Sequence, residues 1–293
     1  MHRTLRSITI AAVLFGAVAA QAQTQSKGLH NTTKQFTAAS EMALSDLSDP
    51  QEIKRTWDAA LLRVPTGPGS SKWINFEELQ AQYGDGSRIF PTAIYMHGCS
   101  GIWPGTLRRI EFLANNGFLV IAPASMARQK YARSCNTATS EGGLYRDVLR
   151  MRQFDAGYAI ENAKTLSFVD AGNMALIGLS EGGIVAATFE PRSERQKVAA
   201  RVIEGWTCNA GWYEYDGVNA PEDEPVLSLV GEQDPWFQDI WTKGDCTDAL
   251  HPSNGSLSVV YRSGKLASRH ELMENPRVQE QTLSFLRQHV DLN

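Results

Sequence analysis

The stretch MALIGLSEGGIVAATF, residues 174–189, decides the fold. Its first four residues form an apolar run typical of a buried strand, and the residues from Gly182 onward have the composition of a helix. Between the two lies GLSEG, with Ser180 at its centre. A G-x-S-x-G match alone is weak evidence, but a strand directly before it and a helix directly after it give the context that a nucleophile elbow needs. Ser180 is therefore the predicted nucleophile, and a glycine-rich structural turn is the alternative.

Short apolar runs and helical patterns alternate around this segment. The predicted strands are 92–96, 118–122, 174–177, 198–203, 225–230 and 257–261, and the predicted helices are 106–116, 143–164 and 278–290. Strands that are apolar on both faces and separated by helices indicate an α/β fold, with a mostly parallel central sheet and helices on both faces. Only about 20 residues separate the strands 198–203 and 225–230, which leaves little room for a large lid.

The N-terminal 22 residues have the pattern of a signal peptide. Basic residues from His2 to Arg6 precede an apolar run, Ile8 to Ala20, and Ala20-Gln21-Ala22 matches a cleavage site. A membrane anchor is the alternative, but the run of about 13 residues is shorter than the roughly 20 that span a bilayer. We expect an exported protein, periplasmic or secreted, with no stable membrane insertion after cleavage.

The remaining chain divides into two predicted parts. Residues 23–65 read as a polar leader followed by a helix over 39–62, which Pro50 interrupts, and a loop that begins at Pro65. Residues 66–293 form the predicted α/β domain. Over the whole chain 20% of residues are charged and the net charge is -4, with no basic block, so nucleic acid is not an expected partner.

Four cysteines, Cys99, Cys135, Cys208 and Cys246, lie beyond the predicted signal peptide. An even number in an exported chain permits two disulfides, in any of three pairings, and free buried thiols are the alternative. No C-x-x-C spacing occurs, so neither a zinc site nor a redox motif is expected.

A second signal is His97-Gly98-Cys99-Ser100-Gly101, directly after the strand 92–96. An oxyanion hole takes one N–H from the residue after the nucleophile, here Glu181, and a second from a loop after an earlier strand. The N–H of Cys99 is the predicted second donor, with Ser100 as the alternative. His97 is expected to orient the loop rather than to act as the base, and a disulfide from Cys99 to Cys135 is a milder interpretation than a nucleophilic cysteine.

The predicted acid is Asp234, in the sequence GEQDPW after the strand 225–230. A serine hydroxyl needs a base to take its proton, and the base needs a carboxylate to fix its tautomer. Asp234 follows a strand that ends at the same sheet edge as Ser180. Glu232, Asp239 and Asp245 are the alternatives.

The predicted base is His270, in SRHE after the strand 257–261. Of six histidines it is the one that follows the acid and lies at the correct edge. The chain order Ser180, Asp234, His270 is the order of the α/β-hydrolase triad.

These pieces together resemble the α/β-hydrolase superfamily and, more narrowly, dienelactone hydrolase-like proteins. The matching segments are YMHGCSG (95–101), VIAPAS (120–125), GLSEGG (178–183), LVGEQDPW (229–236) and SRHE (268–271). The resemblance implies the α/β-hydrolase fold, hydrolysis of esters or lactones through an acyl-enzyme intermediate, and no cofactor or metal. It departs from the cytoplasmic dienelactone hydrolases in one respect, because their elbow carries a cysteine where this chain has Ser180.

The expected partner is therefore a small-molecule ester or lactone. Secreted polyester depolymerases and feruloyl esterase-like enzymes are similar alternatives, as are a peptidase or amidase on the same triad and a non-catalytic protein that kept the fold. Trp103 and Trp236 are the predicted substrate-binding residues, and Trp206 and Trp212 also follow strands. Arg128 and Arg133 could hold a substrate carboxylate or could be solvated surface charges.

Overall fold

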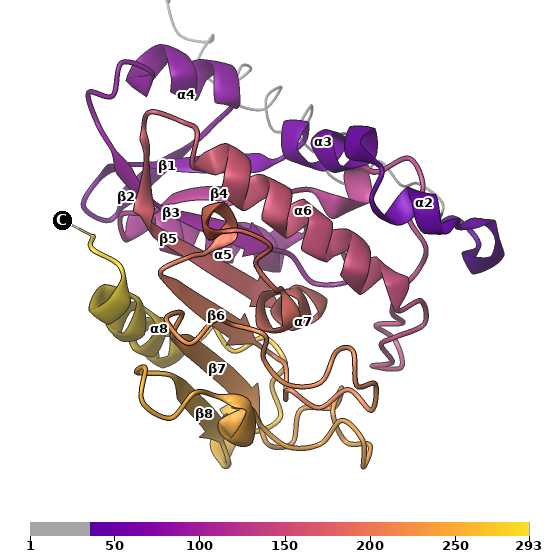
Figure 1. Cartoon of the computed structure of the whole chain (residues 1–293). Helices are drawn as coiled ribbons and strands as arrows, with labels where there is room; N and C mark the ends of the chain where they lie inside the picture. Colours follow the sequence, from indigo (N-terminus) through magenta and orange to yellow (C-terminus); the bar gives the residue numbers. More distant parts are fainter. Residues whose placement is uncertain (1–35, 293) are drawn as a thin grey trace, which may run out of the picture.

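The computed structural model describes residues 36–292, so the predicted signal peptide and most of the predicted leader lie outside the described residues. One mixed sheet of eight strands forms the centre of the molecule (Figure 1). The strands are β1 Leu61–Gly67, β2 Ser70–Ile74, β3 Phe90–Met96, β4 Leu119–Ala122, β5 Val169–Leu179, β6 Ala200–Glu204, β7 Val226–Gly231 and β8 Leu257–Tyr261. Their order is β2-β1-β4-β3-β5-β6-β7-β8. β1 is antiparallel to both of its neighbours, and the strands from β4 to β8 are parallel.

Helices cover both faces of this sheet, as predicted. They are α2 Leu44–Leu47, α3 Pro50–Asp58, α4 Phe76–Tyr83, α5 Pro104–Asn115, α6 Asp147–Ala163, α7 Glu181–Thr188 and α8 Pro276–His289. Buried side chains of α4, α6 and α7 share one core with alternate strand residues such as Ile94 and Leu176. Those of α5 and α8 share the other core with the intervening residues, such as Tyr95 and Ile177. The period-two alternation along the parallel strands therefore divides the apolar side chains between two cores.

The six predicted strands and three predicted helices are confirmed, with shifts at their ends. β5 is longer than predicted, because it begins at Val169 rather than Met174. The segment 205–225 between β6 and β7 contains no helix or strand among the described residues, which agrees with the prediction of no large lid.

The N-terminal part of the domain differs from the prediction. The predicted helix over 39–62 ends at Asp58, and residues from Leu61 onward form β1 and pair with β2 and β4. The boundary placed between residues 65 and 66 therefore falls inside a strand. Pro65 is tolerated there because β1 pairs with β4 only at residues 61–63, so the missing N–H of Pro65 lies beyond that ladder.

Two disulfides, Cys99–Cys135 and Cys208–Cys246, join all four cysteines. The first pair is the one that the sequence favoured for Cys99. No helix in residues 36–292 has both the length and the apolar character of a membrane span.

Candidate active site

Ser180 lies in the turn between β5 and α7 with a backbone φ of 57° and ψ of -120°. A non-glycine residue with a positive φ is strained, and such strain is typical of a nucleophile elbow. The neighbouring glycines are sterically required. A Cβ on Gly178 would lie 1.9 Å from the carbonyl oxygen of Gly182, and one on Gly182 would lie 2.0 Å from the carbonyl oxygen of Met96. The turn can therefore form only with glycine at both flanking positions.

The two predicted oxyanion donors lie next to this turn. Glu181 is the first residue of α7, so its N–H has no carbonyl one turn earlier in the helix to bind. A Cβ on Gly98 would lie 3.7 Å from the Cβ of Ser180, which places the loop after β3 against the predicted nucleophile. Cys99 is buried and lines the same cavity as Ser180 and Glu181, whereas Ser100 is exposed. Cys99 thus lies beside Ser180, and its N–H stays the predicted second donor.

Arg152 of α6 connects the two donor segments. It is fully buried, and it donates to Glu181 Oε1 at 2.6 Å and to the carbonyl oxygen of His97, which precedes Gly98 and Cys99. The hydroxyl of Tyr131 also donates to Glu181 Oε1, at 3.3 Å. One guanidinium therefore holds the carboxylate of the first predicted donor residue and the backbone leading to the second.

His97 lies in this buried cluster, and its role as an orienting residue is consistent with its contacts. Its Nδ1 is 2.7 Å from the carbonyl oxygen of Gly98. Burial, and secondarily the positive charge of Arg152, lowers the pKa of His97 to about 3. The ring is therefore neutral at neutral pH, and its Nδ1–H donates to the Gly98 carbonyl.

Asp234 and His270 are hydrogen-bonded to each other at the edge of the sheet where Ser180 lies. His270 Nδ1 lies 2.7 Å from Asp234 Oδ2, and the backbone N–H of Trp236 donates to Asp234 Oδ1 at 3.1 Å. Asp234 is completely buried, and the ring of Trp236 stacks on that of His270 with centroids 5.2 Å apart. His270 Nε2 is buried and has no hydrogen-bond partner among the described residues. A buried carboxylate on one ring nitrogen leaves the other nitrogen available as a proton acceptor.

The alternative acids make other contacts. Glu232 lies 3.5 Å from Arg262, Asp239 accepts the N–H of Trp241, and Asp245 accepts from Thr247 and Ser258. Of the four carboxylates considered from the sequence, Asp234 is the one that bonds to His270.

The end of β6 contacts both Ser180 and His270. The backbone carbonyl of Glu204 accepts the N–H of Ser180 at 2.7 Å. The next residue, Gly205, has a φ of +65°, and a Cβ there would lie 2.8 Å from the carbonyl oxygen of His270 and 3.1 Å from its Cε1 atom. Ser180 and His270 therefore pack against consecutive residues of one strand end.

The side chain of Glu204 reinforces this junction. It forms a two-point ion pair with Arg109 of α5, with N–O distances of 2.6 and 2.7 Å, and both side chains are buried. Glu204 Oε1 also accepts the backbone N–H of Met273 at 2.7 Å, and Arg109 contacts Glu271 at 3.2 Å. The pair thus anchors the segment that follows His270.

A cavity of about 140 Å³ opens beside Ser180. Trp236 lines it, as do Trp206 and Trp212, but Trp103 does not. Trp103 instead precedes α5, where its ring packs so closely on Gly105 that a Cβ there would lie 2.3 Å from a ring carbon. The structure therefore brings Trp236 to the cavity and leaves Trp103 outside it.

Neither interpretation of Arg128 is correct, because its side chain is buried and paired with Asp155 at 2.5 Å. Arg133 is exposed and lies over the ring of Phe36, with 4.6 Å between the guanidinium carbon and the ring centroid.

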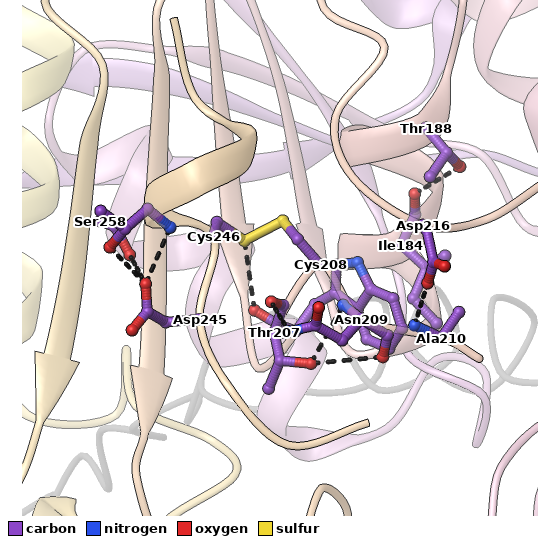
Figure 2. The surroundings of a disulfide bond; sticks show 12 residues. Ile184, Thr188, Thr207, Cys208, Asn209, Ala210, Asp216, Asp245, Cys246 and Ser258 are labelled. Atoms are coloured by element: carbon purple, nitrogen blue, oxygen red, sulfur yellow. Dashed lines mark hydrogen bonds between the residues drawn. A yellow bond between two sulfur atoms is a disulfide. The ribbon is translucent and has the colours of Figure 1, made fainter. Parts of the chain in front are cut away.

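The disulfide Cys208–Cys246 fixes two walls of the cavity relative to each other. Figure 2 shows the bond joining the loop after β6 to the loop after β7, with Ala210 beside it. The backbone of Ala210 donates to Asp216, which holds the first loop in its turn. Sequence reasoning found the cysteines but left their pairing open, because the disulfide joins two different loops.

Among the described residues, no group of three histidine, cysteine or acidic side chains could hold a metal ion. No protein-family model matches the chain, and a search of curated proteins finds no match.

Solved structures are similar in fold. A dienelactone hydrolase-like promiscuous phosphotriesterase from metagenomic libraries has a TM-score of 0.50 and 16% identity, over 79% of this chain and 99% of the other. Brefeldin A esterase, a bacterial homologue of human hormone-sensitive lipase, has a TM-score of 0.45 and 12% identity, over 87% and 88%. An acetyl xylan esterase from a Paenibacillus species has a TM-score of 0.44 and 12% identity, over 90% and 99%. The first likeness, with the strand order of the sheet, shows the α/β-hydrolase fold predicted from the sequence.

Proposed function

We propose that the protein is a serine hydrolase that cleaves ester or lactone bonds through an acyl-enzyme intermediate. The observation that carries this proposal is the buried Asp234–His270 hydrogen bond at the sheet edge where the strained turn presents Ser180. The dienelactone hydrolase-like enzyme that shares the fold is also a hydrolase, which is consistent with this proposal.

The reaction begins when Ser180 Oγ attacks the carbonyl carbon while its proton passes to His270 Nε2. The N–H groups of Glu181 and Cys99 bind the resulting oxyanion, and each such donor is worth about 10²–10³ in kcat. The bond to the leaving oxygen then breaks as His270 returns the proton to that oxygen. Asp234 accepts the Nδ1–H bond throughout and stabilises the imidazolium.

Water completes the cycle by the reverse sequence. His270 takes a proton from the water, the hydroxide attacks the acyl carbon, and the bond to Ser180 Oγ breaks as the serine regains its proton. A carboxylic acid and a free enzyme result. Each of these steps uses only the side chains and backbone groups that line the site, so no cofactor takes part in the proposed reaction.

We also propose that the protein acts outside the cytoplasm. Two disulfides form and persist in an oxidising compartment, and the predicted signal peptide would direct the chain there. The substrate would then be a small molecule that reaches the periplasm or the medium.

The test is turnover of p-nitrophenyl acetate together with labelling by a fluorophosphonate probe. Wild-type protein should do both, and Ser180→Ala should lose both while keeping its circular dichroism spectrum. Ser87→Ala, at an exposed position far along the chain from the site, is the matched control and should behave as wild type. Equal turnover by Ser180→Ala and wild type would refute the proposal.

A further inference from the structure

The cavity beside Ser180 is lined by several aromatic rings, which the proposed reaction alone does not require. We propose that it is an acyl subsite for a single uncharged aromatic ring, so that the substrates are esters of benzoate-type acids. This inference rests on the proposed function, and it names the substrate class.

The position of the cavity assigns it to the acyl side of the scissile bond. Ser180, Glu181 and Cys99 line it, but His270 does not. The leaving oxygen must approach His270 Nε2 in order to receive its proton, so the leaving group lies toward the histidine. Ile184 of α7 also lines the cavity, and the acyl group of the intermediate would lie there, next to Ser180 and the predicted oxyanion donors.

The size of the cavity corresponds to one ring. Its volume is about 140 Å³, and an apolar protein cavity of about 150 Å³ binds benzene. A benzoyl group would fill the space, whereas a long fatty acyl chain would have to extend out of it. An acetyl group would enter but would leave much of the wall without contacts.

The walls are aromatic and held in place. The rings that line the cavity belong to Tyr145, Trp206, Trp212, Trp236 and Phe237. Trp206 and Phe237 meet edge to face, with centroids 5.5 Å apart. The ring of Trp212 lies directly on the backbone of Gly143, where a Cβ would be 2.0 Å from a ring carbon. An added ring would find edge-to-face and stacked partners without rearrangement of the walls, because the disulfides Cys99–Cys135 and Cys208–Cys246, the second shown in Figure 2, fix the surrounding loops.

The charges at the cavity favour a neutral group. Two ionised side chains line it, Arg146 and Glu181, and both are paired. Arg146 contacts Glu214 at 2.8 Å and lies over the ring of Trp212, while Glu181 is bound by Arg152. A substrate carboxylate placed here would lose its water, and Arg146, whose charge Glu214 already balances, would attract it less than an unpaired arginine would.

The experiment compares p-nitrophenyl esters that differ only in the acyl group: acetate, benzoate, octanoate and 4-carboxybenzoate. Each kcat/KM is divided by the rate of hydroxide-catalysed hydrolysis of the same ester, which removes differences in intrinsic reactivity. The normalised value for benzoate should exceed those for octanoate and 4-carboxybenzoate by about 10-fold or more, as expected for a shaped apolar pocket. A preference for octanoate or for 4-carboxybenzoate would overturn the inference.

Two variants test the location of the subsite. Ile184→Phe, which fills the cavity, should lower the benzoate-to-acetate ratio by about 10-fold or more, and Trp212→Ala, which enlarges it, should raise the octanoate-to-benzoate ratio. Leu257→Phe, at an exposed position on β8, is the size-matched control and should change neither ratio. Unchanged ratios in both cavity variants would overturn the assignment of the cavity.

The outcome also separates this inference from the proposed function. Acetate turnover and fluorophosphonate labelling without a benzoate preference would refute the aromatic subsite alone. If the wild-type protein shows neither ester turnover nor fluorophosphonate labelling, the proposed serine hydrolase activity is refuted, and the proposed subsite is refuted with it.

Discussion

Replacement of Arg152 by methionine tests how the oxyanion-hole segments are held. The side chain of Arg152 is fully buried, and its partner Glu181 is 7% exposed. Removal of one member of a buried ion pair leaves an uncompensated charge and costs about 3–5 kcal/mol of the free energy of unfolding. At about 2–4 °C per kcal/mol for a chain of this size, Arg152→Met should lower Tm by roughly 6–20 °C. It should also lower kcat more than it changes KM, because the variant no longer binds the carbonyl of His97.

The assay is thermal unfolding followed by circular dichroism, with ester turnover measured well below Tm. Glu181→Gln combined with Arg152→Met removes the isolated charge, so the double variant should be more stable than Arg152→Met alone. Arg146→Met breaks an exposed ion pair of similar length, and it should cost less than about 1 kcal/mol. The reasoning is refuted if Arg152→Met melts within about 2 °C of wild type, or if the double variant is the least stable of the set.

Three further predictions concern the acid, the buried histidine and a disulfide. Asp234→Asn should lower kcat by about 10³–10⁴, because an amide cannot stabilise the His270 imidazolium; pre-steady-state acylation kinetics would measure this, and a loss under tenfold would contradict it. Because burial lowers the pKa of His97 from 6.5 to about 3, the unfolded chain binds a proton between these values that the folded chain does not. The free energy of unfolding should therefore fall on acidification from pH 6.5 toward 3, by up to about 1.4 kcal/mol per pH unit from this group, and urea titrations across that range should show a smaller slope for His97→Gln. Replacing both Cys208 and Cys246 by alanine should cost about 4 kcal/mol in the same urea assay, since the bond closes a loop with a sequence separation of 38, and an unchanged midpoint would contradict this.

The parts of the fold that local sequence specifies could be predicted. β8 matches its predicted range, and the turn at Ser180 could be placed because its strand, glycines and helix are contiguous in the chain. Asp234 and His270 could be predicted because each follows a strand of a parallel sheet, and the carboxyl ends of such strands share one edge. The hydrogen bond between them agrees with that prediction.

The hairpin of β1 and β2 was not predicted, although the two strands are adjacent in the chain, and neither was the pairing of β1 with β4. β1 is stabilised by β4, about 60 residues further along the chain, and Pro65 gives the segment the composition of a loop. Pro65 lies beyond the residues that pair with β4 and next to a register shift in the pairing with β2, and the sequence of β1 contains no sign of either.

The buried arginines escaped prediction for a related reason. Arg109, Arg128, Arg152 and Arg201 are each at most 1% exposed, yet in the sequence they look like solvated charges. The acidic residue that binds each of them most closely lies 23 to 95 residues away. A charge can be buried only when such a partner is present, so the burial of these residues depends on the tertiary fold and not on their own neighbourhoods.

Glu204 has a consequence for how the protein would lose activity on heating. Its carbonyl accepts the N–H of Ser180, and its carboxylate accepts the N–H of Met273, so the segments that carry the proposed nucleophile and the proposed base share one residue at the end of β6. Neither segment can detach without disturbing the strand that carries the other. Thermal inactivation and global unfolding would then be one cooperative event, and a protein that still has its sheet would still have its activity.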